Sequence, residues 1–480
     1  MKTPAPRLNP NSELEAGFAK IRTELGVPDS FPAQVEQAAT NAARDGVGGF
    51  PRAGGELADK TSMPYITIDP PTSIDLDQAV HIESRRDGFT VSYAIADPAS
   101  FVAPNDPVDV ESHSRGLTFY APDMRTPLYP TSLGEGAASL LPDVERPAFV
   151  WTMTLDVDGV LLTTDVERAM VKSIDKLSYR VAQDRIDSGN GDSTLMALRE
   201  VGELRLAIER QRGGVSLNLP SQEVQMIDGC YELIHDESLI VEDWNAQISL
   251  LTGMAAADLM IGAGVGLLRT LPDPDQQTLD KIRLSALSLG IDWPEEMSYS
   301  ERVRDLRPDQ PRHVALLNSA VRALRGAGYL AFDGEVPSNN RHWAIAAEYA
   351  HVTAPVRRLA DRYANEIAVA ICANERPPTW VMDQLSDLPS TMGKARRAEG
   401  QLDRAIVDYV EAAILSSKIG QRFGATVTSR RRDGLCSMQI NEPAISALVK
   451  TKANPGEVIE VELVTANPDQ RKIRFREVRG

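Results

Sequence analysis

Ile66–Ala79 reads ITIDPPTSIDLDQA and places three aspartates within nine residues, on a loop between two predicted strands. Asp75 and Asp77 are two residues apart, so their side chains point the same way where the loop is extended, and Asp69 can fold back beside them. Such a cluster costs electrostatic repulsion, which a divalent cation relieves, and oxygen ligands suit Mg²⁺ or Mn²⁺. Aspartates also make turns and cap helices, so the spacing alone leaves a metal site and a structural loop both open.

The residues that flank this segment predict a β-rich block followed by a helical one. Alternating apolar residues predict strands at 65–69, 79–83, 89–96, 149–156 and 160–166. Arg-Asp-Gly at 86–88 is expected to form the turn before the third strand, because glycine accepts positive φ. Helical periodicity predicts helices at 195–212, 240–269, 275–289, 311–326, 355–373 and 392–418.

The chain after residue 415 returns to a strand pattern. Short alternating runs predict strands at 424–430, 435–440, 447–449, 458–464 and 472–478. Five short strands in about 60 residues indicate a small barrel of the OB type. The sequence therefore predicts a separate C-terminal domain over residues 416–480.

The first 60 residues predict two helices, over about 12–25 and 30–44, separated by Gly26-Val27-Pro28. Two short helices around a turn form a helix-turn-helix in some proteins, and in others they simply pack on a neighbouring domain. Both interpretations remain open at this point. Residues 46–64 are rich in glycine and proline and are interpreted as a lead-in to the next domain.

Composition limits the class of protein. The 480 residues are 42% hydrophobic and 25% charged, which is typical of a soluble globular protein of two to four domains. We expect no membrane span, because the most strongly apolar stretch, Leu259–Leu268, is far shorter than the ~20 residues needed. The N-terminus has no apolar signal region, and the three cysteines lie far apart, so we expect a cytoplasmic, reducing location.

The formal charge of −17 argues at first against a nucleic-acid-binding protein. The charge is unevenly distributed, however, because residues 416–480 hold 12 basic and 7 acidic side chains and residues 61–415 hold 32 basic and 53 acidic ones. A basic tail is either a solvated surface or a contact for nucleic acid.

Six sequence blocks, in order, resemble those of the ribonuclease II family, whose nuclease domain is called RNB. ITIDPPTSIDLDQA is similar to the family signature, which reads roughly TIDxxxxxDIDDA. The other blocks are YAIADP at 93–98, RGLTFYAP at 115–122, KLSY at 176–179, YAHVTAPVRRLAD at 349–361 and DRAIVD at 403–408. The resemblance implies an α+β multidomain protein, with a helical or helix-turn-helix-like region at 1–60, a mixed α/β RNB nuclease domain at 61–415 and an OB-fold at 416–480.

The resemblance also implies an activity. Family members are 3′→5′ exoribonucleases that hydrolyse single-stranded RNA processively to nucleoside 5′-monophosphates with Mg²⁺ or Mn²⁺. By resemblance, Asp69, Asp75, Asp77 and Gln78 hold the metal ions, and Asp77 is the residue expected to be indispensable. Gln78 stands where the family has a fourth aspartate, so we expect weaker metal binding there.

Two further residues carry predicted catalytic roles. Arg357 matches the arginine that contacts the scissile phosphate, and Arg358 beside it is expected to contact RNA. Asp403 stands where the family has glutamate and is expected to orient Arg357 or the attacking water. Without the resemblance, an ion pair on a helix surface would be the favoured interpretation of Arg357.

The predicted RNA contacts are aromatic in the nuclease domain and basic in the tail. Tyr120 resembles the residue that stacks on a base, and Tyr179 resembles the one that senses the ribose. Without the resemblance, the favoured interpretation of both would be that they are core residues. The tail is poor in aromatic residues, so binding there is expected to depend on Arg430, Arg431 and Arg432 and on the salt concentration.

Three hypotheses follow from the sequence. The first is an active exoribonuclease, the second a catalytically weakened RNA-binding protein on the same scaffold, and the third, less supported, a helix-turn-helix regulator. Under the first two hypotheses, single-stranded RNA is the expected partner. No membrane or protein partner is expected, and the chain is expected to be monomeric. Given the net charge of −17, an RNA-binding protein of this sequence is predicted to line its RNA path with arginine and lysine and to turn its acidic residues outward.

Overall fold

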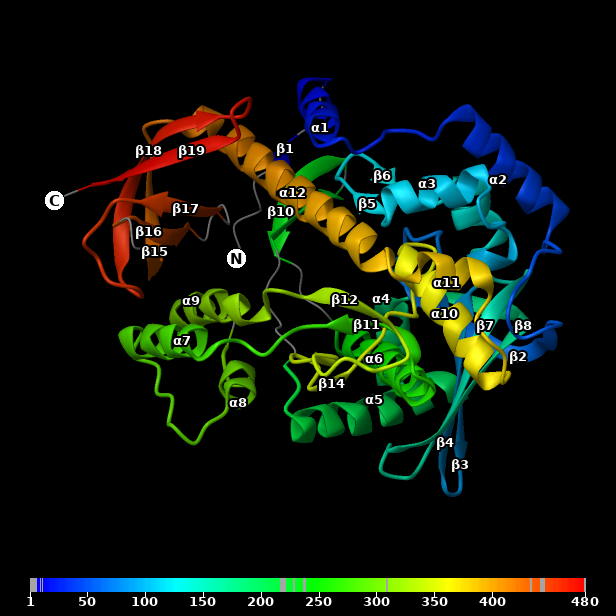
Figure 1. Ribbon diagram of the computed structural model, residues 1–480. Helices are drawn as coiled ribbons and strands as arrows, with labels where there is room; N and C mark the ends of the chain where they lie inside the picture. Colours follow the sequence, from blue (N-terminus) through cyan, green and yellow to red (C-terminus); the bar gives the residue numbers. More distant parts are fainter. Residues whose placement is uncertain are drawn as a thin grey trace.

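The computed structural model describes the chain except for residues 1–6, 9, 11, 216–221, 228, 236–238, 308–309, 432–433, 441–444 and 479–480. A closed barrel lies in the nuclease body, a five-stranded sheet forms the C-terminal domain, and the long helix α12 (Leu388–Leu415) runs between them (Figure 1). The predicted α+β multidomain architecture is confirmed.

The closed barrel consists of β2 (Ala58–Asp69), β3 (Gln78–Arg85), β4 (Gly88–Ala96), β7 (Glu145–Leu155) and β8 (Leu161–Ser178). Neighbouring strands are antiparallel, except that β2 and β8 close the barrel in parallel register. Gly88 begins β4 at φ 142°, directly after the predicted turn, and a Cβ there would lie 2.0 Å from the carbonyl oxygen of Leu155. Only glycine fits this close approach, so the predicted turn is confirmed.

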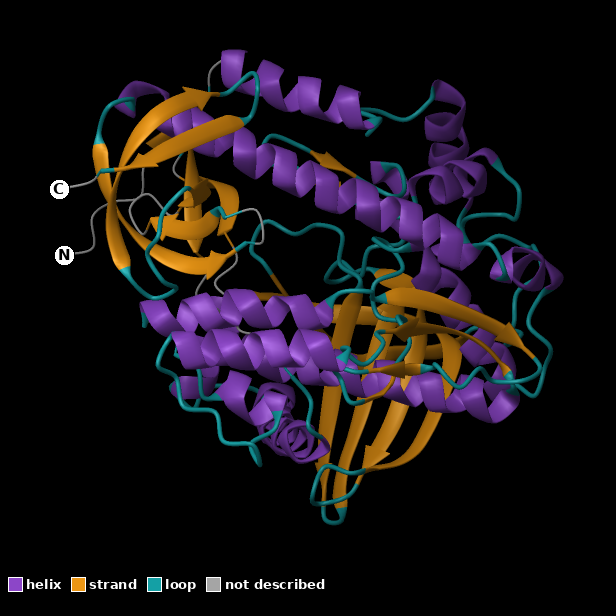
Figure 2. Ribbon diagram, turned by 60° about the vertical axis from the view of Figure 1, so that its left-hand side comes forward, coloured by secondary structure: helices purple, strands orange, loops and turns teal. Residues whose placement is uncertain are grey.

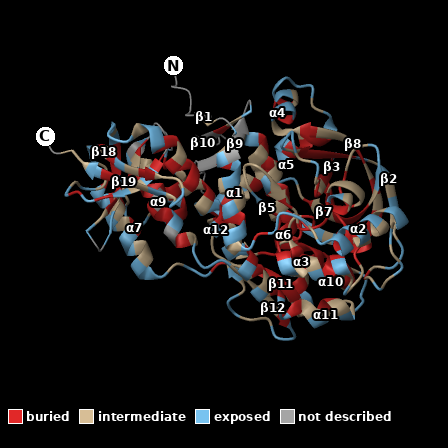
Figure 3. Ribbon diagram, turned by 90° about the horizontal axis from the view of Figure 1, so that it is seen from above, coloured by how far each residue is buried: buried red, intermediate tan, exposed pale blue. Residues whose placement is uncertain are grey.

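Helices surround the barrel, and buried residues concentrate there (Figures 2 and 3). They include α4 (Tyr179–Asp187), α5 (Ser193–Arg212), α6 (Ile240–Ala263), α10 (Leu359–Cys372) and α11 (Thr379–Leu385). α6 packs against α5 and α10. By length and composition α6 is apolar enough to cross a membrane, but half of its apolar window is buried inside the protein, which is typical of a core helix.

The predicted helix over 240–269 is wrong in its last turns. The helix ends at Ala263, because Gly264 adopts a left-handed conformation at φ 72°. Val265–Thr270 then forms β11, which pairs antiparallel with β12 (Gly328–Asp333). A short apolar run has no periodicity that separates strand from helix, and the partner strand lies far along the chain. The predicted helix at 355–373 likewise begins only at Leu359.

The C-terminal domain contains the five predicted strands, β15 (Arg422–Arg430), β16 (Cys436–Ile440), β17 (Ile445–Val449), β18 (Val458–Asn467) and β19 (Lys472–Glu477). They form one antiparallel sheet in the order β17-β16-β15-β18-β19. The end strands β17 and β19 also contact each other, so the sheet nearly closes in the manner of an OB-fold. Next to it, α7 (Gln276–Ser288), α8 (Tyr299–Arg304) and α9 (Pro311–Ala320) enclose their own apolar cluster.

The N-terminal helices α1 (Ser12–Leu25) and α2 (Ala33–Asp45) pack on the nuclease body. α1 lies on α12, where the ring of Phe18 meets that of Tyr409 edge to face at 5.6 Å. α2 packs on α3 (Pro107–Arg115). Of the two interpretations of this helical pair, packing on a neighbouring domain is therefore the one that the structure supports.

The remaining elements are short. Two-residue strands occur at Arg7–Leu8 (β1), Phe119–Tyr120 (β5), Arg125–Thr126 (β6), Arg341–His342 (β13) and Ala347–Glu348 (β14). β9 (Gln222–Ile227) and β10 (Cys230–His235) form a hairpin to which β1 adds a third strand. The other helical turns are Pro98–Ser100, Ser132–Ala137, Val321–Leu324 and Ser416–Lys418.

Candidate active site

The aspartate loop lies at one end of the closed barrel, between β2 and β3. Asp69 is the last residue of β2 and is paired with Ser178, the last residue of β8, while Gln78 is the first residue of β3. The loop that carries Asp75 and Asp77 is therefore anchored at both ends by barrel strands. Tyr179 follows directly as the first residue of α4, so the predicted ribose-sensing residue begins its helix at the same end of the barrel.

Asp77 forms an ion pair with Arg357 across 280 positions of the chain. Asp77 is 1% exposed, and its Oδ1 accepts a hydrogen bond from the Val356 backbone N–H at 2.8 Å. Its Oδ2 accepts one from Arg357 Nε at 2.6 Å. Burial raises the pKa of the Asp77 carboxyl to about 6, although Arg357 acts in the opposite direction. The two residues predicted to be essential are therefore in direct contact.

The guanidinium of Arg357 is held through one nitrogen only. Its side chain is 40% exposed, and its two terminal nitrogens have no hydrogen-bond partner among the described residues. Arg357 lines a cleft of about 530 Å³. A planar fork that is fixed at one nitrogen and open at the others is suited to bind a phosphate.

Asp69 carries an unpartnered oxygen. Its Oδ2 is buried without a hydrogen bond. Burial raises the pKa of the Asp69 carboxyl to about 6; Arg357 lowers it, and the charges of Asp77 and Asp75 raise it further. The three aspartates therefore repel one another, as the sequence predicts, and this repulsion is what a bound cation would relieve.

Asp75 is already neutralised by an arginine. Its Oδ1 lies 2.6 Å from Nη1 of Arg125, which also pairs with Glu135. Among the described residues, no group of three or more Asp, Glu, His or Cys is arranged to hold a metal ion. In this arrangement the oxygen donors fit a divalent cation in their chemistry, and among the described residues Asp69 is the one of the three aspartates with a buried oxygen that accepts no hydrogen bond.

Both the nitrogen and the oxygen of the Gln78 side-chain amide form hydrogen bonds. Its Nε2 donates to the carbonyl oxygen of Thr353 at 2.6 Å, and its Oε1 accepts from the Tyr93 hydroxyl, which also bonds Ser249 at 2.9 Å. An aspartate could not donate to Thr353. These contacts favour a positioning role for Gln78, and its predicted role as a metal ligand stays a prediction.

The cleft brings several predicted residues together with others that the sequence did not indicate. Predicted residues that line it are Gln78, Tyr120, Arg357 and Arg358. The additional ones include Arg269, Tyr329, His342, Tyr349, His351, Arg396 and Glu399. Four arginines and one glutamate line the cleft, so its charge agrees with the prediction of a basic path in an acidic body.

The two predicted tyrosines differ in exposure. Tyr120 is 48% exposed in the cleft, which leaves its ring available for stacking. Tyr179 is half-buried and is not among the residues that line the cleft. Burial and the nearby charge of Asp69 raise the pKa of the Tyr179 hydroxyl to about 12. Arg358 pairs with Asp361 at 2.7 Å and so reaches the cleft with its charge partly satisfied.

Asp403 lies on the exposed surface of α12 and is not among the cleft residues. Glu399, one helical turn earlier, lines the cleft and pairs with Arg396. The predicted role of Asp403 in orienting Arg357 stays a prediction, because the contact that holds Arg357 comes from Asp77. The spacing of four residues between Glu399 and Asp403 is the signal that could have indicated Glu399.

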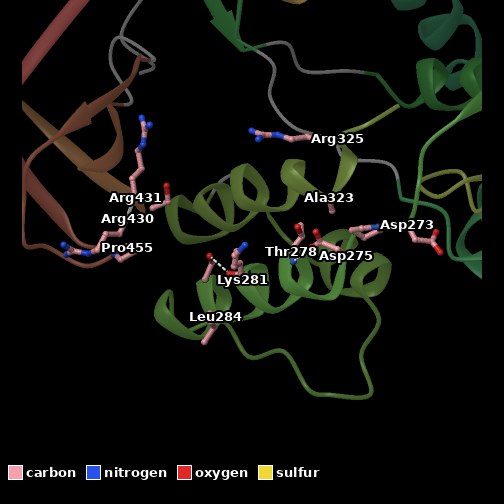
Figure 4. Close-up of a pocket in the computed structure, with 13 residues that line it drawn as sticks. Asp273, Asp275, Thr278, Lys281, Leu284, Ala323, Arg325, Arg430, Arg431 and Pro455 are labelled. Atoms are coloured by element: carbon pink, nitrogen blue, oxygen red, sulfur yellow. Dashed lines mark hydrogen bonds between the residues drawn. The ribbon is translucent and has the colours of Figure 1, made fainter. Parts of the chain in front are cut away.

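The predicted basic residues of the tail lie in a second cleft, of about 860 Å³, between the C-terminal sheet and α7 (Figure 4). Arg430 and Arg431 approach from the sheet, Lys281 from α7 and Arg325 from the opposite side. Arg430 donates hydrogen bonds to the carbonyl oxygens of Lys452 and Ala453 at 2.9 and 2.8 Å. Part of its guanidinium is therefore used to hold that loop in place. Arg432 lies outside the described residues.

Comparison with known proteins places this site in a family. The model of the RNB domain matches residues 58–373, and that of the RNase II-type exonuclease C-terminal S1 domain matches residues 421–478. The chain belongs to the RNase II family. The predicted domain boundaries, 61–415 and 416–480, stay predictions; the first matched range ends at residue 373.

A curated relative, Ribonuclease R of Escherichia coli, is 24% identical over 475 residues, which cover 87% of this chain and 57% of the relative. The curated relatives are longer proteins, and this chain covers between 38% and 62% of their length. Among solved structures, Mycoplasma genitalium RNase R in complex with ribose-methylated single-stranded RNA superposes with a TM-score of 0.84 at 19% identity, covering 98% of this chain and 78% of that one.

The same fold also occurs in a protein described as a pseudonuclease. Yeast Ssd1 superposes with a TM-score of 0.71 at 15% identity and covers 91% of this chain and 55% of its own. Fold therefore does not decide whether this site is catalytic, and the side chains must carry that argument.

Proposed function

We propose that the chain is a metal-dependent exoribonuclease that degrades single-stranded RNA from the 3′ end, processively, to nucleoside 5′-monophosphates. The observation that carries the proposal is the contact between Asp77 and Arg357. It leaves the two terminal guanidinium nitrogens without a hydrogen bond to any residue that the structure describes, at a cleft of about 530 Å³. Preorganised donors of this kind stabilise the charge that develops on phosphate oxygens during hydrolysis. Curated relatives that are named Ribonuclease R and Exoribonuclease 2 support the same class of substrate.

We assign Asp69, Asp75 and Asp77 as the residues that hold the metal, with Mg²⁺ or Mn²⁺ as the cation. A bound divalent cation would supply an activated water and would neutralise charge on the phosphate. The unpartnered Oδ2 of Asp69 and the mutual repulsion of the three carboxylates support this assignment. Asp77 has a second task, because its Oδ2 fixes the plane of the Arg357 guanidinium.

RNA is proposed to reach this site along the two clefts. In the catalytic cleft, Tyr120 stacks on a base and Arg358 contacts the backbone, while Tyr179 senses the ribose from the end of β8. Stacking is worth about 1–3 kcal/mol per base and is tolerant of sequence. In the second cleft, Arg430 and Arg431, and Arg432 beyond the described residues, contact phosphates, which makes binding dependent on salt.

The test is to incubate 5′-labelled single-stranded RNA with the chain and Mg²⁺ or Mn²⁺, beside Asp77→Asn. The expected result is shortening from the 3′ end with release of nucleoside 5′-monophosphates, lost in the variant and in the presence of a chelator. Release of internal fragments, or equal activity of the variant, would contradict the proposal.

A catalytically weakened RNA-binding protein is the second candidate. Specific observations favour it: the hydrogen-bonded amide at Gln78, the exposed position of Asp403 and the pairing of Asp75 with Arg125. Binding of single-stranded RNA without cleavage, at millimolar Mg²⁺ and Mn²⁺, would establish this candidate in place of the first.

A further inference from the structure

Arg269 is a cation in the catalytic cleft without a carboxylate partner. It lies on β11, and its backbone N–H donates to the carbonyl oxygen of Tyr349 at 2.7 Å, which fixes the strand at the wall of the cleft. Its guanidinium lies 4.9 Å from the centre of the Tyr329 ring. Within the described part of the chain, no Asp or Glu forms an ion pair with it.

The other two arginines on this side of the cleft are already paired. Arg358 is neutralised by Asp361, and Arg396 by Glu399. Of these three arginines, Arg269 is therefore the one whose positive charge is not balanced by a described carboxylate. Burial lowers the pKa of the Arg269 guanidinium, and the charges of Arg396 and Arg358 lower it further.

The lowered pKa values of two histidines indicate the same positive electrostatic potential in the cleft. Burial lowers the pKa of His342 to about 4, and Arg269 contributes to that shift. Burial also lowers the pKa of His351, with contributions from Arg358 and Arg269. His351 is held neutral in a hydrogen bond of 2.7 Å to the hydroxyl of Tyr329, the ring on which Arg269 lies. A half-buried cation among neutral rings, without a counter-ion of its own, is a site for an anion.

We propose that Arg269 binds a backbone phosphate of the RNA strand other than the one held by Arg357, and so sets the position of the strand in the cleft. This inference rests on the proposed function. The guanidinium lies over the Tyr329 ring, 4.9 Å from its centre, and a planar guanidinium can present two edge nitrogens to the two oxygens of a phosphate, which a lysine ammonium cannot. In this scheme Arg269 is a positioning residue, whereas Arg357 contacts the phosphate that reacts.

The experiment measures equilibrium binding of a fluorescent single-stranded RNA by anisotropy, in a chelator so that no hydrolysis occurs, at several salt concentrations. Arg269→Gln is expected to bind about tenfold more weakly near 0.1 M salt, since it loses a charge-assisted contact. Its plot of log affinity against log salt should be shallower by about 0.7, the value for one phosphate contact on a single strand. Arg199→Gln is the matched control, because Arg199 is an exposed arginine of α5 paired with Glu203, and it should behave as wild type.

The outcomes separate the inference from the proposed function. If the wild type binds RNA and Arg269→Gln has the same affinity and the same salt slope, the inference alone is overturned. If the wild type binds no RNA, the proposed function is overturned. If the glutamine variant does not fold, Arg269→Lys decides, because it should keep the wild-type slope with weaker affinity, and a shallower slope would contradict a phosphate contact. In hydrolysis assays, KM of Arg269→Gln should rise by more than kcat falls, which a purely structural role would not produce.

Discussion

Arg168 and Arg357 both bind an aspartate of the closed barrel, but they use their donors differently. Arg168 is fully buried, and it donates to Asp97 at 2.9 Å, to both carboxylate oxygens of Glu366 and to the carbonyl oxygen of Ala53. Arg357 donates to Asp77 alone among the described residues, and its side chain is 40% exposed in the cleft. The first guanidinium is saturated and the second is not.

The aspartates show the same contrast. Asp97 accepts hydrogen bonds from the backbone and hydroxyl of Ser100 in addition to its bond from Arg168. Asp69 has a buried Oδ2 without a partner. Most buried polar groups are hydrogen-bonded, so a buried carboxylate oxygen that lacks a partner and lies beside other charged groups is a candidate to bind a ligand. The difference explains why one cluster is structural and the other is proposed to be catalytic.

Arg168→Met should show the largest effect, because it leaves two buried carboxylates without a counter-ion. Breaking a buried pair in this way costs about 3–5 kcal/mol of unfolding free energy. Urea denaturation measures it. A loss below 1 kcal/mol would show that the cluster is not the structural site described here.

Arg357→Ala should still fold, with a loss of unfolding free energy because the buried Asp77 loses its counter-ion, and should lose RNA hydrolysis. Removal of one preorganised donor at a reacting oxyanion lowers kcat by about 10²–10³. Single-turnover release of nucleoside 5′-monophosphates measures the loss, and urea denaturation serves as the control for folding. Hydrolysis at the wild-type rate would remove Arg357 from the proposed mechanism.

Asp69→Asn should make the protein more stable at pH 7 in the absence of metal, by roughly 1 kcal/mol, because it removes a buried charge without a partner. The pKa of Asp69 is raised by burial to about 6, so the charged form destabilises the folded state above pH 6. The gain should therefore shrink as the pH falls from 6 and should vanish below 3.8, where the carboxyl is neutral in both the folded and the unfolded state.

Asp75→Asn is the matched control for that experiment. The chemical change is the same, but Asp75 is paired with Arg125 at 2.6 Å, so the variant should not gain stability. Thermal denaturation at pH 4, 6 and 8 compares the two. Equal gains in both variants would mean that the missing partner of Asp69 has no energetic consequence.

Gln78→Glu should change the unfolding free energy by as little as Asp69→Asn does, in the opposite direction. It replaces the Nε2 donor with an oxygen that faces the carbonyl of Thr353, so the unfolding free energy should fall by about 1 kcal/mol. Urea denaturation of the metal-free protein measures it. A variant as stable as the wild type would show that the amide does not connect β3 to the Thr353 segment.

The sequence predicted the parts of the molecule that depend on local patterns. The barrel strands around Ile66–Ala79, the turn before Gly88 and the five C-terminal strands follow from alternation and turn chemistry, and the family blocks led to Asp77 and Arg357. These two residues are 280 positions apart, and their contact could be expected only through the resemblance.

Long-range pairing explains most of what the sequence missed. β11 was interpreted as helix because its partner β12 lies about 60 positions away, and Arg269 was overlooked with it. The ion pair of Asp75 with Arg125 joins two loops, and no periodicity reports it. The hydrogen bonds of the Gln78 amide with Tyr93 and Thr353 also come from other parts of the chain, so the sequence does not indicate them; the metal-ligand role of Gln78 stays a prediction.

The most direct test measures unfolding and hydrolysis together in Arg357→Lys and Arg168→Lys, two variants with the same chemical change. Arg357→Lys should unfold within about 1 kcal/mol of the wild type and lose most of its RNA hydrolysis, because lysine cannot hold Asp77 and a phosphate with one planar fork. Arg168→Lys should lose stability, and its remaining hydrolysis should follow the folded fraction. Wild-type hydrolysis by Arg357→Lys, or an equal loss of stability in both variants, would contradict the distinction between the saturated and the unsaturated arginine.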